Sequence, residues 1–165
     1  MSFSYSVKEL VEMAIGLELN GEAFYRALAD KADRKDIIAI YNGLAIEEKK
    51  HLNSFQRLLK SLGEYKSPEA NNEEYMLYLK ALGENTVFST APEAQQRAAT
   101  LSSQIEALNI GIQAEKDSIL FFQGMRDFLQ PTDHRFVLAI IREEQAHLKQ
   151  LSDLKATIEK KSKKP

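Results

Sequence analysis

The sequence contains no cysteine and no tryptophan, and its 165 residues include only 7 glycines and 4 prolines. Without cysteine the chain can form no disulfide framework, thiol nucleophile, zinc ribbon or cysteine-ligated iron centre. Any bound metal must therefore have nitrogen and oxygen ligands. The scarcity of turn-forming residues, together with apolar residues at intervals of three and four, predicts an almost wholly helical protein.

The sequence also lacks an excess of charge and a long apolar run. Its 22 basic and 24 acidic residues nearly cancel, so it has no electrostatic footprint for nucleic acid or for an anionic membrane. No apolar segment is long enough to span a bilayer, and the N-terminal stretch does not resemble a signal peptide. We therefore expect a cytoplasmic protein with no nucleic-acid or membrane partner.

Apolar periodicity divides the chain into two helical hairpins. The first is expected at about residues 6–62 and the second at about 103–159. A crossover at about 63–102 joins them and contains one short amphipathic helix in "NEEYMLYLKAL", and a basic tail occupies residues 160–165. The predicted fold class is all-α, a four-helix bundle forming a single domain over the whole chain.

Local signals mark the predicted helix ends. Ser6 with Glu9, and Ser103 with Glu106, have the spacing of a capping box at a helix N-terminus. Gly63 follows the second helix, where a glycine commonly ends a helix. These signals start the two hairpins at Ser6 and Ser103, which are equivalent positions.

The two hairpins repeat one pattern of polar residues within apolar helix faces. Each carries a glutamate in its first helix and a Glu-x-x-His pair in its second helix. Equivalent positions differ by 97 residues in the first helices and by 96 in the second helices. The six residues are Glu18, Glu48, His51, Glu115, Glu144 and His147. Because the register is duplicated, two unrelated surface pairs are a poor explanation.

The six side chains together have the chemistry of a metal site. Residues three apart project from one helix face, so each Glu-x-x-His pair can hold one ion. Four carboxylates and two imidazoles in a dry core would repel one another unless protons or cations neutralised them. Two divalent cations would balance the charge. Carboxylate and imidazole ligands suit iron or manganese, and zinc could occupy the same ligands.

This arrangement of ligands is that of the ferritin-like di-iron and di-manganese bundles. The sequence resembles the rubrerythrin family, in its short form without a rubredoxin domain, over essentially Ser6 to Leu154. The segments that carry the resemblance are "MAIGLELNGEAFY", "LAIEEKKHL", "YMLYLKAL", "IGIQAEKDSILFF" and "IREEQAHL".

The resemblance implies a non-haem di-iron oxidoreductase that reduces peroxide or dioxygen. Two iron ions would be bridged by Glu48 and Glu144, with Glu18 and Glu115 as terminal ligands and each histidine completing one metal's shell. Rubrerythrins typically receive electrons from a cysteine-ligated iron domain. Because this chain has no cysteine, the resemblance implies an external electron-donor protein.

The sequence departs from the rubrerythrin pattern at one position. Ser118 stands where the family commonly has a further glutamate, and Gly21 is its equivalent in the first helix. The remaining six-residue set is closer to that of bacterioferritin, but no methionine near Glu48 offers a haem ligand and no fifth apolar helix follows residue 160. A storage cage is therefore disfavoured. The alternatives are an iron-binding, ferroxidase or metal-buffering protein, and a structural bundle that acts through protein partners.

Several residues near the six are weaker candidates for a role at the metal site. Tyr25 lies two turns after Glu18 on the same face and could donate its hydroxyl to a ligand carboxylate, or simply be a core aromatic. Glu47 and Glu143 could orient the opposite hairpin's histidine, although the favoured interpretation is that both are exposed. Glu22 is either an additional ligand or a solvated glutamate.

Apolar and aromatic residues in the crossover predict a homodimer. They are Tyr75, Met76, Tyr78 and Phe88.

Overall fold

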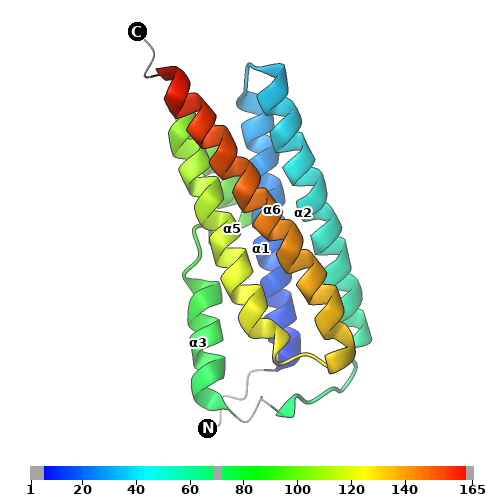
Figure 1. Ribbon diagram of the computed structural model, residues 1–165. Coiled ribbons are helices and arrows are strands. Elements are labelled where there is room, and N and C mark those ends of the chain that lie inside the picture. The colour runs from blue at the N-terminus through cyan, green and yellow to red at the C-terminus, as the bar shows by residue number, and fades with distance from the viewer. Residues whose placement is uncertain (1–5, 69–71, 163–165) are drawn as a thin grey trace.

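The computed structural model describes residues 6–68 and 72–162, and these residues form six α-helices (Figure 1). Two antiparallel hairpins dominate, because α1 packs along α2 and α5 packs along α6. The predicted all-α four-helix architecture is confirmed. The long helices are α1 (Val7–Lys31), α2 (Lys35–Ser61), α5 (Gln104–Arg126) and α6 (Pro131–Ser162). The last of these extends into the predicted basic tail, whose final residues 163–165 lie outside the described residues.

The predicted signals mark the helix ends with one exception. Ser6 and Glu9 form the full capping box of α1, in which the Ser6 N–H donates to Glu9 Oε2 over 2.6 Å. At the start of α5 only half of the predicted box is described, because Ser103 Oγ accepts from the Glu106 N–H over 3.4 Å. Gly63 follows α2 with a φ of 53°, which a glycine adopts without strain.

The crossover contains two short helices where the sequence predicted one. The predicted helix is α3 (Glu73–Glu84), which lies against α5 and α1. A second helix, α4 (Ala91–Thr100), packs against α1. Its N-terminus is capped by Thr90, whose side chain accepts from the Glu93 N–H, and Pro92 sits in the first turn, where proline is tolerated.

The four crossover residues that suggested a dimer do not share one environment. Met76 and Phe88 are buried in this chain's own core, at 3% exposure each, whereas Tyr78 is 46% exposed. Tyr75 is half-buried and stacks on Tyr78. The homodimer stays a prediction, and Met76 and Phe88 are not available to its interface.

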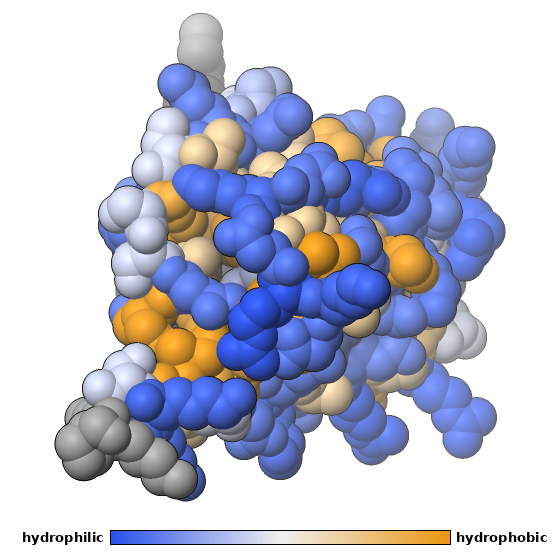
Figure 2. All heavy atoms as spheres, turned by 90° about the horizontal axis from the view of Figure 1, so that it is seen from above, coloured by the Kyte–Doolittle hydropathy of each residue, from blue (hydrophilic) through white to orange (hydrophobic). Residues whose placement is uncertain are grey.

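The apolar core is divided into two clusters along the bundle. One cluster gathers around Phe55, Phe122 and Phe128, and the other around Phe24 and Tyr41. Viewed from one end, the molecule is mainly hydrophilic, with a smaller group of hydrophobic residues at one side (Figure 2). No helix within the described ranges is long and apolar enough to cross a membrane.

Candidate metal centre

The six polar residues singled out in the sequence all lie inside the bundle. Each of the four long helices contributes to this group, with single glutamates on α1 and α5 and Glu-x-x-His pairs on α2 and α6. All six are at most 7% exposed, and they lie between the two apolar clusters. They are Glu18, Glu48, His51, Glu115, Glu144 and His147.

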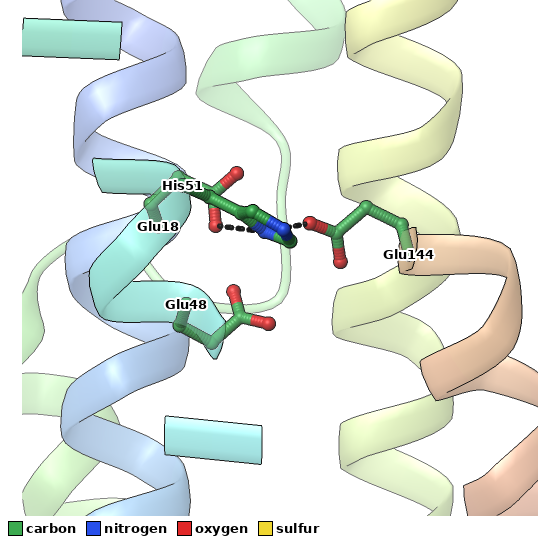
Figure 3. Close-up of side chains that lie close together, drawn as sticks. All are labelled: Glu18, Glu48, His51 and Glu144. Atoms are coloured by element: carbon green, nitrogen blue, oxygen red, sulfur yellow. Dashed lines mark ion pairs between the residues drawn. The ribbon is translucent and has the colours of Figure 1, made fainter. Parts of the chain in front are cut away.

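The first half of the centre joins α1, α2 and α6. Nδ1 of His51 lies 2.6 Å from Glu144 Oε1 and 3.6 Å from Glu18 Oε2. Figure 3 shows these side chains pointing toward one another from facing helices, with Glu48 beside them. One ligand atom from each of the four residues lies within 4.8 Å of the others. A single cation could contact all four.

The second half of the centre shares two carboxylates with the first half. Nδ1 of His147 lies 3.2 Å from Glu48 Oε1, 3.4 Å from Glu144 Oε2 and 3.6 Å from Glu115 Oε2. These four residues form a second group of atoms within 4.8 Å of one another. Glu48 and Glu144 belong to both groups, so they occupy the positions expected of bridging carboxylates.

The buried polar atoms of the centre lack ordinary hydrogen-bond partners. Both carboxylate oxygens of Glu18 and of Glu144, one oxygen of Glu48, and Nδ1 of both histidines have none. The close contacts between imidazole and carboxylate therefore do not have hydrogen-bond geometry, although the atoms are near. Unpaired buried polar groups are costly and uncommon in proteins. A donor set of this kind fits two cations, which would accept electron pairs from all of these atoms.

The protonation behaviour of the centre reflects its crowding. Burial, followed by the negative charges of Glu144 and Glu48, raises the pKa of Glu18 well above its usual range. Burial and the same two neighbours also raise the pKa of Glu115. Burial alone would lower the pKa of His51, but the adjacent Glu144 carboxylate raises it to about 9. Without metal, protons must therefore carry the balancing charge.

Glu144 differs from the other three carboxylates. Burial tends to raise its pKa, but the adjacent imidazoles of His147 and His51 outweigh burial and hold that pKa well below the usual range. Glu144 is therefore the carboxylate that stays ionised between two protonated histidines. Its central position is the one from which a single anion can neutralise both imidazoles.

Tyr25 contacts the centre across the two hairpins. Its hydroxyl donates to Glu115 Oε1, and the side chain is 1% exposed. The sequence left open whether Tyr25 donates its hydroxyl to a ligand carboxylate or is simply a core aromatic, and the structure shows the donor. Burial, followed by the Glu115 charge, raises the pKa of Tyr25 well above its usual range, so the hydroxyl keeps its proton. The equivalent residue in the second hairpin is Phe122, which has no hydroxyl.

Glu143 is exposed, as the favoured interpretation of its sequence position has it, and it also contacts the centre from outside. The Nε2–H of His51 donates to Glu143 Oε2 over 2.7 Å, although the Glu143 side chain is 56% exposed. Glu47, its equivalent, instead pairs with Lys50 over 2.6 Å. The signal available in the sequence was the repeated Glu-Glu-x-x-His register, which placed both residues beside the opposite hairpin.

Glu22 does not join the centre. Its carboxylate forms ion pairs with Arg26 at 2.9 Å and with Lys49 at 3.6 Å. Neither of the two groups of four ligand atoms includes it. Of the two interpretations of this residue, the arrangement favours a glutamate that pairs helices at the edge of the bundle.

A small void lies beside the centre between α1 and α5. Its volume is about 20 Å³, and its lining includes Gly21, Tyr25, Glu48, Glu115 and Ser118. A segment of the crossover, residues 86–88, completes the lining. The void has room for a molecule about the size of water.

Gly21 makes room for the carboxylate of Glu48. A Cβ atom built on this residue would lie 2.8 Å from Glu48 Oε2, closer than real Cβ contacts allow. We therefore expect Gly21→Ala to displace Glu48 and weaken binding of the metal pair about tenfold or more. Isothermal titration of the metal-free variant with Mn²⁺ measures the change.

Gly16→Ala is the matched control for this substitution. Gly16 lies on the same helix, and a Cβ atom there would meet nothing within 4 Å. Because alanine favours a helix over glycine by up to about 1 kcal/mol, the control should be slightly more stable and bind metal normally. Equal metal affinity in the two variants would mean that Gly21 does not position Glu48.

Comparison with known proteins agrees with this geometry. The rubrerythrin family profile matches residues 9–155, so the chain belongs to the rubrerythrin family. A crystal structure from Thermotoga maritima, described as a ferritin-like diiron-carboxylate protein, matches with a TM-score of 0.71 and 25% sequence identity. The match covers 94% of this chain and 98% of that one. No curated protein matches at a significant level.

Proposed function

We propose that this member of the rubrerythrin family binds two iron ions and reduces peroxide or dioxygen with them. The observation that carries the proposal is the arrangement of two four-residue groups around the shared carboxylates Glu48 and Glu144. Dinuclear sites use bridging ligands to hold two metals close enough to act on one substrate. Glu18 with His51, and Glu115 with His147, would complete the two shells.

The residues beside the centre support the reduction of a small oxidant. An iron pair bound there would supply the two electrons which, with two protons, convert hydrogen peroxide into two molecules of water. The void of about 20 Å³ is small enough to favour peroxide or dioxygen over a bulky hydroperoxide. Tyr25 holds a proton at the edge of this void, where a departing oxygen atom could accept it.

Electrons must reach the centre from outside this chain, because it has no cysteine with which to hold a mononuclear iron donor. A separate electron-donor protein is therefore part of the proposal. The same observation favours the alternative function, in which the centre oxidises or buffers iron without repeated peroxide turnover. Manganese or zinc would bind the same ligands, and zinc would supply no redox chemistry.

Stopped-flow mixing tests the proposed function. Protein loaded anaerobically with two Fe²⁺ per chain is mixed with hydrogen peroxide, and the absorbance of ferric iron is followed. We expect rapid oxidation of both ions, and repeated cycles when a chemical reductant is present. A single oxidation followed by further iron uptake would support the alternative. Failure of peroxide to oxidise the loaded protein would rule out the peroxidase proposal.

A further inference from the structure

The two halves of the centre differ in what surrounds their ligands, although their ligand sets are equivalent. On one side, His51 Nε2–H donates to Glu143 over 2.7 Å. Glu47, the sequence equivalent of Glu143, pairs with Lys50 on its own helix and lies near His51 and Glu143. Tyr25 donates a hydrogen bond to Glu115. Among the described residues, Glu18, the equivalent carboxylate, has no hydrogen-bond partner at either oxygen.

These contacts change the strength of the ligands in opposite directions. A carboxylate that accepts the distal N–H of an imidazole makes the other ring nitrogen more basic and fixes its orientation, and losing such a contact commonly weakens metal binding 10- to 100-fold. A hydroxyl that donates to a ligand carboxylate withdraws negative charge from it. Through these two outer contacts, Glu143 strengthens His51 as a ligand and Tyr25 weakens Glu115.

We infer that the two metal positions have unequal affinity, that the position held by Glu18 and His51 fills first, and that Glu143 is the positioning residue responsible. The weaker position, held by Glu115 and His147, is also the one beside the void, whose lining includes Glu115 but neither Glu18 nor His51. The more tightly bound ion and the ion beside the void, where the small oxidant would enter, are thus different ions. This inference rests on the proposed two-metal function.

Glu143→Gln and Glu47→Gln form a matched pair of variants for the test. A glutamine at position 143 can still accept the His51 N–H through its carbonyl, so the substitution removes charge and keeps the contact. The substitution at position 47 removes the same charge from a half-buried neighbour of His51 whose carboxylate accepts from Lys50 instead. Metal-free samples of the wild-type protein and both variants are titrated with Co²⁺, whose absorption spectrum reports the ligands of each ion.

The wild-type protein should bind two Co²⁺ ions in two resolved steps. Repulsion between the ions lowers the second affinity at any such site, so the variants decide the question. We expect Glu143→Gln to weaken the first step about tenfold, the lower end of the usual range because the amide still accepts the His51 N–H, and to change the spectrum of the first ion. The second step should stay within about threefold of the wild-type value, and Glu47→Gln should change neither step.

Two kinds of result would overturn the inference. One is an equal loss in both steps, or no loss, on substitution of Glu143. The other is an identical effect of the Glu47 substitution. A protein that binds no Co²⁺ pair at all would instead defeat the proposed function. Circular dichroism and thermal unfolding of each metal-free sample show whether a change arises from misfolding, which would also alter the apo-protein and would count against a positioning role.

Discussion

Replacing Glu48 and Glu144 together by glutamine should abolish binding of a metal pair and destabilise the metal-free protein. The two carboxylates are the only residues shared by the two buried groups of four within the described chain. Without them neither ion retains more than two of the four ligands in its group. A protein held with free metal at 100 times its dissociation constant gains about 2.7 kcal/mol of stability, and the variant should lose this gain entirely.

The loss in the metal-free protein follows from the charge of Glu144. Burial tends to raise the pKa of this carboxyl, but the adjacent imidazoles of His147 and His51 outweigh burial and hold the pKa well below its usual range. Removing one partner of a buried ion pair leaves the other charge uncompensated and costs about 3–5 kcal/mol. Each kcal/mol lost should lower the midpoint of thermal unfolding by roughly 2–4 °C in a protein of this size.

A double substitution of exposed glutamates controls for the loss of net charge. Glu64 and Glu159 are exposed and lie outside the centre. Changing both to glutamine should leave metal content and thermal midpoint nearly unchanged. Metal content by elemental analysis and thermal midpoint by circular dichroism measure both effects. A Glu48/Glu144 variant that still binds two ions, or whose metal-free form unfolds at the same temperature as the metal-free wild type or higher, would contradict the prediction.

Raising the pH should destabilise the metal-free protein between about pH 4.5 and pH 9. Glu18 and Glu115 have pKa values raised above the usual value of about 4.5, and His51 has a pKa raised from about 6.5 to about 9. Each group therefore binds its proton more tightly in the folded state than in the unfolded state. Stability falls with pH wherever the folded state binds more protons.

The size of this loss of stability, and its absence in the metal-loaded protein, are both measurable. For His51 alone the shift corresponds to a loss of about 3 kcal/mol by pH 9. Metal ions replace the protons and bind better as the ligands lose them, so the loaded protein should not show this decline. Urea unfolding at a series of pH values, with and without Mn²⁺, provides the comparison. A metal-free protein that becomes more stable from pH 6 to pH 9 would contradict the account.

The sequence could predict the metal centre because the duplication constrains it. Mid-helix glutamates such as Glu18 are ambiguous singly, but an equivalent residue in the second hairpin fixes the face on which both lie. The structure brings all six residues together, while their role as ligands stays a prediction. Tyr25 was also accessible from the sequence, since its position two turns from Glu18 placed it on the same face.

The sequence offered the role of Glu143 only as one alternative, because that role depends on how the two hairpins meet. Its partner His51 is 92 positions away, and helical periodicity gives no information about contacts between hairpins. The equivalent Glu47 has the same local sequence signal but pairs with Lys50 instead. Repetition therefore predicts what the two halves share and not where they differ.

The helix α4 was missed for a local reason. Its sequence "APEAQQRAAT" begins beside a proline and follows several turn-forming residues, so the segment was interpreted as part of an irregular crossover. Thr90, Pro92 and Glu93 are in fact good signals for a helix N-terminus. The apolar face is small, because only Ala94 and Ala98 are buried along it, and periodicity of alanine is a weak signal.

Diffraction from crystals of the iron-loaded protein at the iron absorption edge tests the central claim most directly. The account predicts two anomalous peaks per chain between α1, α2, α5 and α6, one near Glu18 and His51 and one near Glu115 and His147, with Glu48 and Glu144 between them. A centre without peaks in crystals grown with saturating Fe²⁺, or peaks confined to exposed carboxylates such as Glu64, would contradict it.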